Sequence, residues 1–334
     1  MIDETFAPPE IVSSALQLPT ADGEILHVQR FSATTEASGP PVVLLHGLAE
    51  DGRVFYPAHG HGLASCLATA GYSVYVPDLR GHGQSTPAMA PGLVITQQAL
   101  VSQDMPALFA LLAESHSGQA WVGMGHGAGG LWLASALIRH PQWLTSCAGL
   151  VHFATRRASA SNSWRKRLVI AWLWQGVLTR VSRVKGYMPA VALGAGTNNE
   201  SCQLQREVLD WMQGASAWRD LTDGFDYANA LQNVNWPPGL YLAGKADRVM
   251  GAATDVKAFA RELGRHDAQV VVLEQGSGCS RNYGHNDLLT HAQAAMDHFP
   301  LVQEWLRQQY NKVQGVRALH RPDNREEDRP CTTS

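Results

Sequence analysis

The sequence predicts an α/β protein, built as a doubly wound and mostly parallel sheet with an inserted helical cap. Several short runs are apolar without interruption, as expected of strands that are buried on both faces. Segments with helical patterning lie between most of these runs, and this alternation is typical of a parallel sheet with helices on both sides. With 334 residues, 45% hydrophobic and 16% charged, the chain is long enough for one packed core and an insertion.

Two β-like runs open the fold, separated by the turn signal Thr20-Ala21-Asp22-Gly23. The third run, Pro41-Val42-Val43-Leu44-Leu45, is apolar throughout and ends at His46-Gly47. The same continuous pattern recurs along the chain, so further buried strands are expected. The expected strands are 11–18, 24–31, 41–45, 73–77, 120–124, 148–153, 239–243 and 269–273.

Helices are expected at about 62–70, 93–114, 128–139, 252–263 and 300–309. The alternation breaks between about 155 and 236, so we expect a core made of 1–155 and 237–309 and a helical cap at 156–236. Residues 310–334 are polar, mixed in charge and without periodicity, which predicts a disordered tail.

Ahead of Trp236, the segment 156–236 holds half of the ten tryptophans. These are Trp164, Trp172, Trp174, Trp211 and Trp218. One interpretation is a helix around 164–184 that packs on the core, and the other is an amphipathic lid over an apolar pocket or at a lipid surface. Periodicity does not separate the two.

The composition excludes several classes of protein. A net charge of −3 without a basic run argues against nucleic acid as the main partner. The five scattered cysteines never form a CxxC pair, which predicts free thiols in a reducing compartment rather than a disulfide framework or a zinc site. The acidic N-terminus is unlike a signal peptide, and no run approaches the ~18 apolar residues of a membrane span, so a cytoplasmic location is expected. No cofactor is expected, and no histidine spacing predicts a metal site.

The strongest functional signal is a set of short segments that follow predicted strands in a fixed order. They are His46-Gly47, Asp78-Leu79-Arg80-Gly81-His82-Gly83-Gln84-Ser85, Gly125-His126-Gly127-Ala128-Gly129, Asp247 in Gly244-Lys245-Ala246-Asp247, and His285 in Tyr283-Gly284-His285. Together these segments resemble the α/β-hydrolase superfamily, in particular lipase- and esterase-like members with a helical cap. The resemblance covers roughly 10–309.

The resemblance implies a role for each segment. Residue 127 would stand at the tip of a sharp strand-to-helix turn, where the superfamily carries its nucleophile. The backbone N–H groups of Leu48 and Ala128 would form an oxyanion hole. His285 would be the general base, and Asp247 would orient it.

The resemblance also implies a substrate pocket. It would be lined by His46, His126, Trp172 and Trp174, and its ligand would be a small apolar or ester-like molecule.

The chain departs from this pattern at the turn itself. The superfamily pattern is G-x-S-x-G, whereas this chain has Gly127 in the place of the serine. Glycine has no hydroxyl, so His285 has nothing to deprotonate there and no acyl-enzyme can form. Removing the serine from a subtilisin-type triad lowers kcat by a factor of about 2 × 10⁶.

Four other side chains are candidates to replace the missing nucleophile. His126 is expected to be a packing residue beside the turn, and Ser85 to support its own loop. Ser277 and Cys279 precede His285 in a glycine- and serine-rich loop. Either side chain could reach the site only if the conformation of this loop brings it there. Three explanations for the presence of Asp247 and His285 stay open. The two residues are inherited from an active ancestor and have not yet changed, or they still act as a dyad that activates water. In the third, the serine was deliberately replaced by glycine.

Three functions therefore remain open on the sequence. The first is an enzyme that uses the His–Asp dyad as a base on an apolar ester. The second is a non-catalytic ligand-binding protein, for which the N-Myc-downstream-regulated proteins, α/β-hydrolase-like chains that lack the catalytic set, provide a precedent. The third is a protein-interaction module that uses the cap and the tail.

Overall fold

The structure is a computed structural model that describes residues 10–34, 38–117, 119–159, 179–213 and 218–319. Within these ranges the chain forms one eight-stranded sheet, in the order β1-β2-β4-β3-β5-β6-β7-β8. β1 pairs antiparallel with β2, and β2 pairs antiparallel with β4, whereas every other pairing is parallel. The predicted doubly wound, mostly parallel sheet is confirmed.

All eight expected strands are present, with bounds that differ from the prediction by at most two residues. They are β1 Ile11–Pro19, β2 Ile25–Ala33, β3 Val42–Leu45, β4 Val74–Pro77, β5 Trp121–His126, β6 Cys147–Phe153, β7 Gly239–Gly244 and β8 Ala268–Leu273. β3 to β7 are buried along most or all of their length, which explains their unbroken apolar character.

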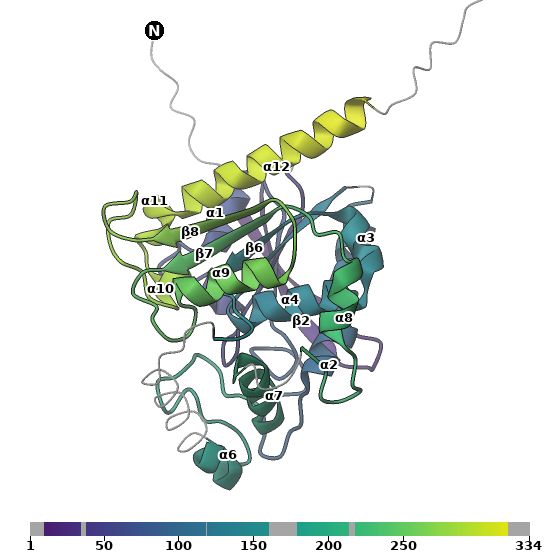
Figure 1. Cartoon of the computed structure of the whole chain (residues 1–334), viewed down its shortest axis with the longest axis vertical. Coiled ribbons are helices and arrows are strands. Elements are labelled where there is room, and N and C mark those ends of the chain that lie inside the picture. The colour runs from purple at the N-terminus through teal and green to yellow at the C-terminus, as the bar shows by residue number, and fades with distance from the viewer. Residues whose placement is uncertain (1–9, 35–37, 118, 160–178, 214–217, 320–334) are drawn as a thin grey trace, which may run out of the picture.

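The described helices lie mainly between these strands and at the C-terminal end (Figure 1). They are α1 Leu63–Thr69, α2 Gln97–Ala99, α3 Met105–Ser115, α4 Ala128–Arg139, α6 Thr179–Lys185, α7 Cys202–Gln213, α8 Tyr227–Ala230, α9 Ala253–Glu262, α10 Asp287–Thr290, α11 Ala294–Asp297 and α12 Phe299–Leu319. None of these helices is long and apolar enough to cross a membrane.

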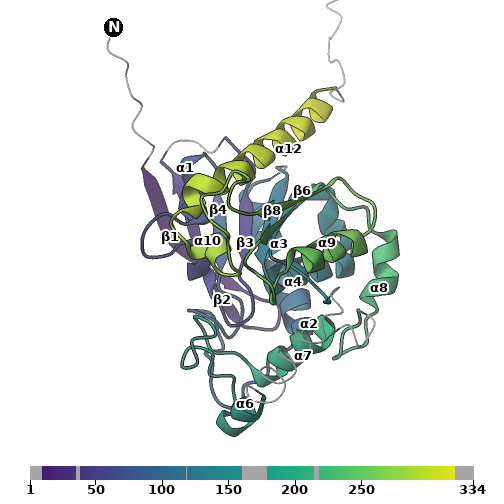
Figure 2. The ribbon, with the colours of Figure 1, turned by 60° about the vertical axis from the view of Figure 1, so that its left-hand side comes forward.

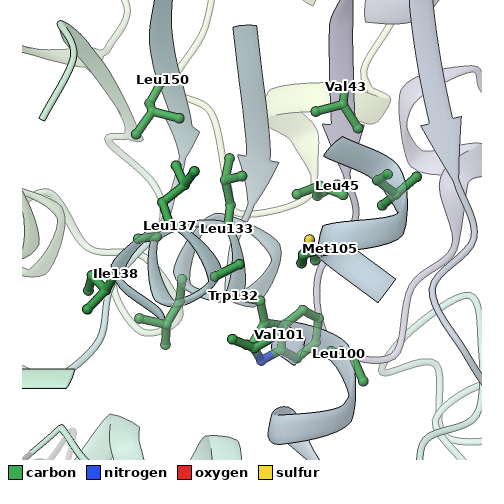
Figure 3. Packing of buried hydrophobic residues seen from close by; sticks show 14 of the residues in the cluster. Val43, Leu45, Leu100, Val101, Met105, Trp132, Leu133, Leu137, Ile138 and Leu150 are labelled. Atoms are coloured by element: carbon green, nitrogen blue, oxygen red, sulfur yellow. The ribbon is translucent and has the colours of Figure 1, made fainter. Parts of the chain in front are cut away.

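The sheet is covered by helices on both faces (Figures 1 and 2). On β3, Val43 and Leu45 belong to the core formed with α3, α4 and α9, as Figure 3 shows for α4 and its surroundings. Val42 and Leu44 belong to the opposite core, formed with α1 and α12. This alternation places a strand between two apolar layers and fixes its register, because a slip by one residue would exchange the two sets.

The predicted helix over 93–114 is interrupted in the structure. After α2, residues Leu100–Asp104 form a π-helical turn that leads into α3 at Met105. Pro106 at the start of α3 has no N–H to donate to the preceding turn, and a wider turn accommodates the lost hydrogen bond. Periodicity alone does not reveal this change of register.

The C-terminal helix is longer than predicted. α12 runs to Leu319, ten residues beyond the expected end at 309, so the expectation of a disordered tail from residue 310 is wrong for 310–319. The added residues include no proline and several good helix formers, and in Figure 1 the end of α12 projects from the body of the protein. Residues 320–334 lie outside the described ranges.

Between β6 and β7 the described chain contains α6, α7 and α8. In both views α6 and α7 lie beyond the end of the sheet, below β2 and α2 (Figures 1 and 2). Trp211 and Trp218 are buried and pack at 6.4 Å between ring centroids. These two tryptophans therefore have the packing role, whereas Trp164, Trp172 and Trp174 lie outside the described ranges.

Candidate active site

The candidate site lies where parallel strands end. β3, β5, β6 and β7 run in the same direction, so the loops that follow them meet at one edge of the sheet, the usual ligand-binding edge of such a fold. A cavity of about 350 Å³ lies at this edge. It is lined by Gly47, Leu48, Glu50, Gly127, Ala128, Leu131, Ala154, Arg156, Ala195, Gly196, Val208, Met212, Met250, His285 and Asn286.

Gly127 forms a sharp turn between β5 and α4. Its backbone has φ 50° and ψ −117°, a conformation that a side chain adopts only under strain. The turn is tight because Gly125 approaches the start of the helix: a Cβ on Gly125 would lie 2.3 Å from the nitrogen of Gly130. The glycine spacing therefore creates the turn that the sequence pattern predicted.

His285 and Asp247 are brought together from the loops after β8 and β7. His285 Nδ1 lies 2.7 Å from Asp247 Oδ2. The other carboxylate oxygen of Asp247 accepts hydrogen bonds from the backbone N–H groups of Val249, at 3.2 Å, and Met250, at 2.9 Å. Both oxygens of Asp247 are thus engaged, and the imidazole is held in one orientation.

Burial and charge set the protonation states of this pair. Burial alone would raise the pKa of Asp247, but its hydrogen bond with His285 and the attraction between the two groups outweigh it and lower that pKa to about 2. Burial, together with repulsion from His126, lowers the pKa of His285 in spite of Asp247. At neutral pH the pair is a carboxylate beside a neutral imidazole, which is the state that a general base needs.

His285 faces Gly127 across a short gap. A Cβ added to Gly127 would lie 3.3 Å from His285 Nε2 and 3.6 Å from its Cε1. The nitrogen that is not bonded to Asp247 therefore points at the place where residue 127 would carry its side chain.

The two amides expected to bind an oxyanion both belong to cavity-lining residues, Leu48 and Ala128. Neither N–H makes a hydrogen bond within the described part of the chain. The loops that carry them are adjacent, because a Cβ on Gly47 would lie 3.6 Å from Ala128 N. Two free donors on neighbouring loops can bind one oxygen atom.

A second buried pair, Glu50 and His126, lies next to the first. Glu50 Oε2 lies 2.8 Å from His126 Nδ1 and accepts a hydrogen bond from Gly47 N at 2.8 Å. The ring of His126 lies 4.5 Å from that of His285, and its Nε2 is 3.2 Å from the His285 carbonyl oxygen. Attraction to His126 outweighs burial and lowers the pKa of Glu50 to about 2. The pair ties the loops after β3 and β8 to the end of β5.

Not all of the residues predicted to line the pocket lie at the wall of the cavity. His46 and His126 are fully buried and are not among the lining residues. His46 Nε2 instead accepts a hydrogen bond from Leu79 N at 3.0 Å. Trp172 and Trp174 lie outside the described ranges.

Sequence reasoning missed Glu50 and Arg156. Both are charged residues a few positions after an uninterrupted buried strand, and this placement is the signal that would have identified them. Over the described ranges, no group of three or more histidine, cysteine or acidic side chains is arranged to hold a metal ion.

Comparisons with known proteins show the family of the chain. The model of the family described as "Serine aminopeptidase, S33" matches residues 40–277. Pimeloyl-[acyl-carrier protein] methyl ester esterases are similar in sequence: that of Xanthomonas campestris pv. campestris is 29% identical over 270 residues, covering 76% of this chain and 93% of the relative. That of Stenotrophomonas maltophilia is 28% identical over 279 residues, covering 78% and 93%.

Solved structures share the fold at lower identity. The α/β-hydrolase GrgF from Penicillium sp. sh18 superimposes with a TM-score of 0.59 at 17% identity, covering 90% of this chain and 99% of the other. A thermophilic esterase from Thermogutta terrifontis gives a TM-score of 0.54 at 19% identity, covering 89% and 99%. The chain belongs to the serine aminopeptidase S33 family within the α/β-hydrolase superfamily, and its relatives there include esterases.

Proposed function

We propose that this protein binds an apolar, ester-like acyl compound in the cavity above Gly127 and does not turn it over through an acyl-enzyme. One observation carries the proposal. The residue that faces His285 Nε2, with the turn geometry of a nucleophile position, has no side chain. A base, its orienting carboxylate and two free N–H donors surround a position without a nucleophile.

The other described residues of the cavity wall do not supply a substitute. None of them carries a hydroxyl, a thiol or an amine. Ser85 Oγ donates to the Asp78 carbonyl at 2.6 Å and accepts from His27 N at 2.8 Å, so it has the supporting role expected of it. Burial raises the pKa of the Cys279 thiol, which disfavours the thiolate that nucleophilic attack needs.

The apolar character of the wall supports the choice of ligand. Leu131 lies in the first turn of α4, and Val208 and Met212 reach the cavity from α7. Because the insertion supplies part of the wall, we propose that 156–236 acts as a cap over the site. The esterase relatives act on an acyl methyl ester, and a ligand of the same chemical class fits an apolar wall with a polar end.

A second candidate is a non-covalent hydrolase in which His285 activates water. The intact 2.7 Å contact between His285 and Asp247 and the lowered pKa of His285 favour it. An imidazole that is neutral at pH 7 would accept a proton from water bound in the cavity, and such general-base catalysis contributes ~10²–10⁴-fold.

Wild-type protein and a His285→Ala variant separate the two candidates. With a panel of p-nitrophenyl esters at pH 8, we expect His285→Ala to leave the slow wild-type rate unchanged within about twofold, because no nucleophile awaits activation. A fluorophosphonate probe, which labels activated serines, should leave both proteins unmodified in intact-mass spectra. A fall of ~10²–10⁴-fold in His285→Ala, with Gly127→Ala retaining activity, would instead establish the water-activating enzyme.

A further inference from the structure

Two charged side chains, Glu50 and Arg156, belong to the described wall of the cavity, and they differ in how well they are paired. The Glu50 carboxylate is paired with His126 and also accepts a hydrogen bond from Gly47 N. Arg156 is the only lysine or arginine among the described lining residues. Within the described ranges its pairing is much weaker.

Arg156 lies three residues beyond the end of β6 and is only 4% exposed. One terminal nitrogen of its guanidinium lies 3.4 Å from Asp255 Oδ2, a long contact. Its Nε is buried and has no hydrogen-bond partner within the described ranges. A guanidinium has five N–H donors in a fixed plane, and the long contact with Asp255 engages only one terminal nitrogen of this one.

Such an arrangement is unfavourable without a ligand. Burial outweighs the attraction of Asp255 and Asp247 and lowers the pKa of Arg156. Buried cations in proteins are normally paired and hydrogen-bonded, because an uncompensated charge in the interior is strongly destabilising. A buried, under-paired guanidinium in the wall of a cavity points to an anion that comes from outside the protein.

We propose that Arg156 binds a terminal carboxylate of the ligand in this cavity, while the ligand's hydrocarbon chain packs against Leu131, Val208 and Met212. The inference rests on the proposed ligand-binding function and names its substrate class: acyl chains that end in a carboxylate. A planar carboxylate matches the donor geometry of a guanidinium. Arg156 is a single cation, and the carboxylates of Glu50 and Asp247 lie nearby. The site therefore suits a ligand with one negative charge better than a phosphate dianion.

Octanoate and octan-1-ol test this directly, since they share a chain length and differ in charge. Calorimetric titration of the wild-type protein at pH 8 keeps His285 neutral, so that Arg156 is the cation under test. We expect octanoate to bind about 10- to 100-fold more tightly than octan-1-ol, the range that a charge-assisted hydrogen bond provides. In Arg156→Gln this preference should disappear, while the affinity for octan-1-ol stays within about twofold.

Arg157→Gln is the matched control. Arg157 is the neighbouring arginine, is paired with Glu262 and is not among the lining residues, so this variant should keep the full preference for octanoate. Loss of the preference in Arg157→Gln as well would show a general effect of charge and overturn the assignment.

The wild-type comparison needs no variant and decides the matter even if Arg156→Gln fails to fold. Equal affinities of the wild-type protein for the two probes would overturn the role of Arg156 and leave the apolar pocket standing. No binding of either probe would overturn the ligand-binding function together with the inference that rests on it.

Discussion

Replacing Gly127 by serine is expected to raise the hydrolysis of short p-nitrophenyl esters by at least about 10³-fold over the wild-type protein. Removing the serine from a complete triad lowers kcat by a factor of about 2 × 10⁶, because the members act as a unit. Here His285, Asp247 and the free N–H groups of Leu48 and Ala128 are already arranged around residue 127. Most of the missing rate should therefore return with the hydroxyl.

The pH profile of Gly127→Ser should report on His285. Catalysis needs the neutral imidazole, so activity should be lost as the pH falls through the pKa of His285 and should be constant above it. Because burial and His126 lower that pKa, the half-maximal rate should lie at a pH below the 6.5 of an ordinary histidine. Adding His285→Ala to Gly127→Ser should abolish the gain. A folded Gly127→Ser protein without any gain would show that the oxyanion donors or the cavity no longer suit an ester.

The same substitution should cost stability. A serine would have to adopt φ 50°, ψ −117°, which costs about 1–3 kcal/mol. Its Cβ would lie 3.3 Å from His285 Nε2, so the imidazole must move by a few tenths of an ångström. This opposition between activity and stability is expected at a strained turn.

The sheet could be predicted from the sequence because its strands are buried on both faces. Val42–Leu45 and Trp121–His126 are buried at every position, so they stand out as unbroken apolar runs bounded by turn residues. The positions of Gly127 and Asp247 followed from the same signal, since each comes shortly after such a run. His285 lies in a long loop after β8, which is only partly buried. The resemblance to hydrolases then supplied their expected roles.

Other features could not be predicted, because they depend on contacts between distant segments. Glu50 and His126 are 76 residues apart, and Arg156 and Asp255 are 99 residues apart. No periodicity links such partners, and each side chain alone looks like an ordinary charged residue at the end of a strand. Whether a charge is paired or left free is decided by the folded structure, and that difference is what distinguishes Glu50 from Arg156.

The largest expected loss of stability comes from Arg80, in the loop after β4. Its guanidinium contacts Asp104 at 2.6 Å and Asp22 at 2.7 Å. Asp104 is fully buried at the π-helical turn, and one of its oxygens also accepts from Arg80 N at 3.1 Å. Arg80→Met would leave the Asp104 carboxylate buried without its cation.

We expect Arg80→Met to lower the free energy of unfolding by about 3–5 kcal/mol, the cost of breaking a buried ion pair from one side. Arg307→Met is the control: Arg307 is exposed and, in the part of the chain that the structure describes, is paired with Glu304 alone, so its loss should change stability by less than about 1 kcal/mol. Chemical denaturation at pH 7 measures both.

The pH dependence of this loss identifies its cause. Burial outweighs Arg80 and raises the pKa of Asp104 to about 6, and without Arg80 that pKa should rise further. A carboxyl whose pKa is raised on folding is best tolerated when protonated, so the penalty in Arg80→Met should be smallest near pH 4 and should grow as the pH rises through 6. Adding Asp104→Asn, which removes the charge, should recover much of the loss at pH 7. A penalty that is independent of pH and unaffected by Asp104→Asn would show that Arg80 stabilises the protein through packing of its side chain and not by neutralising Asp104.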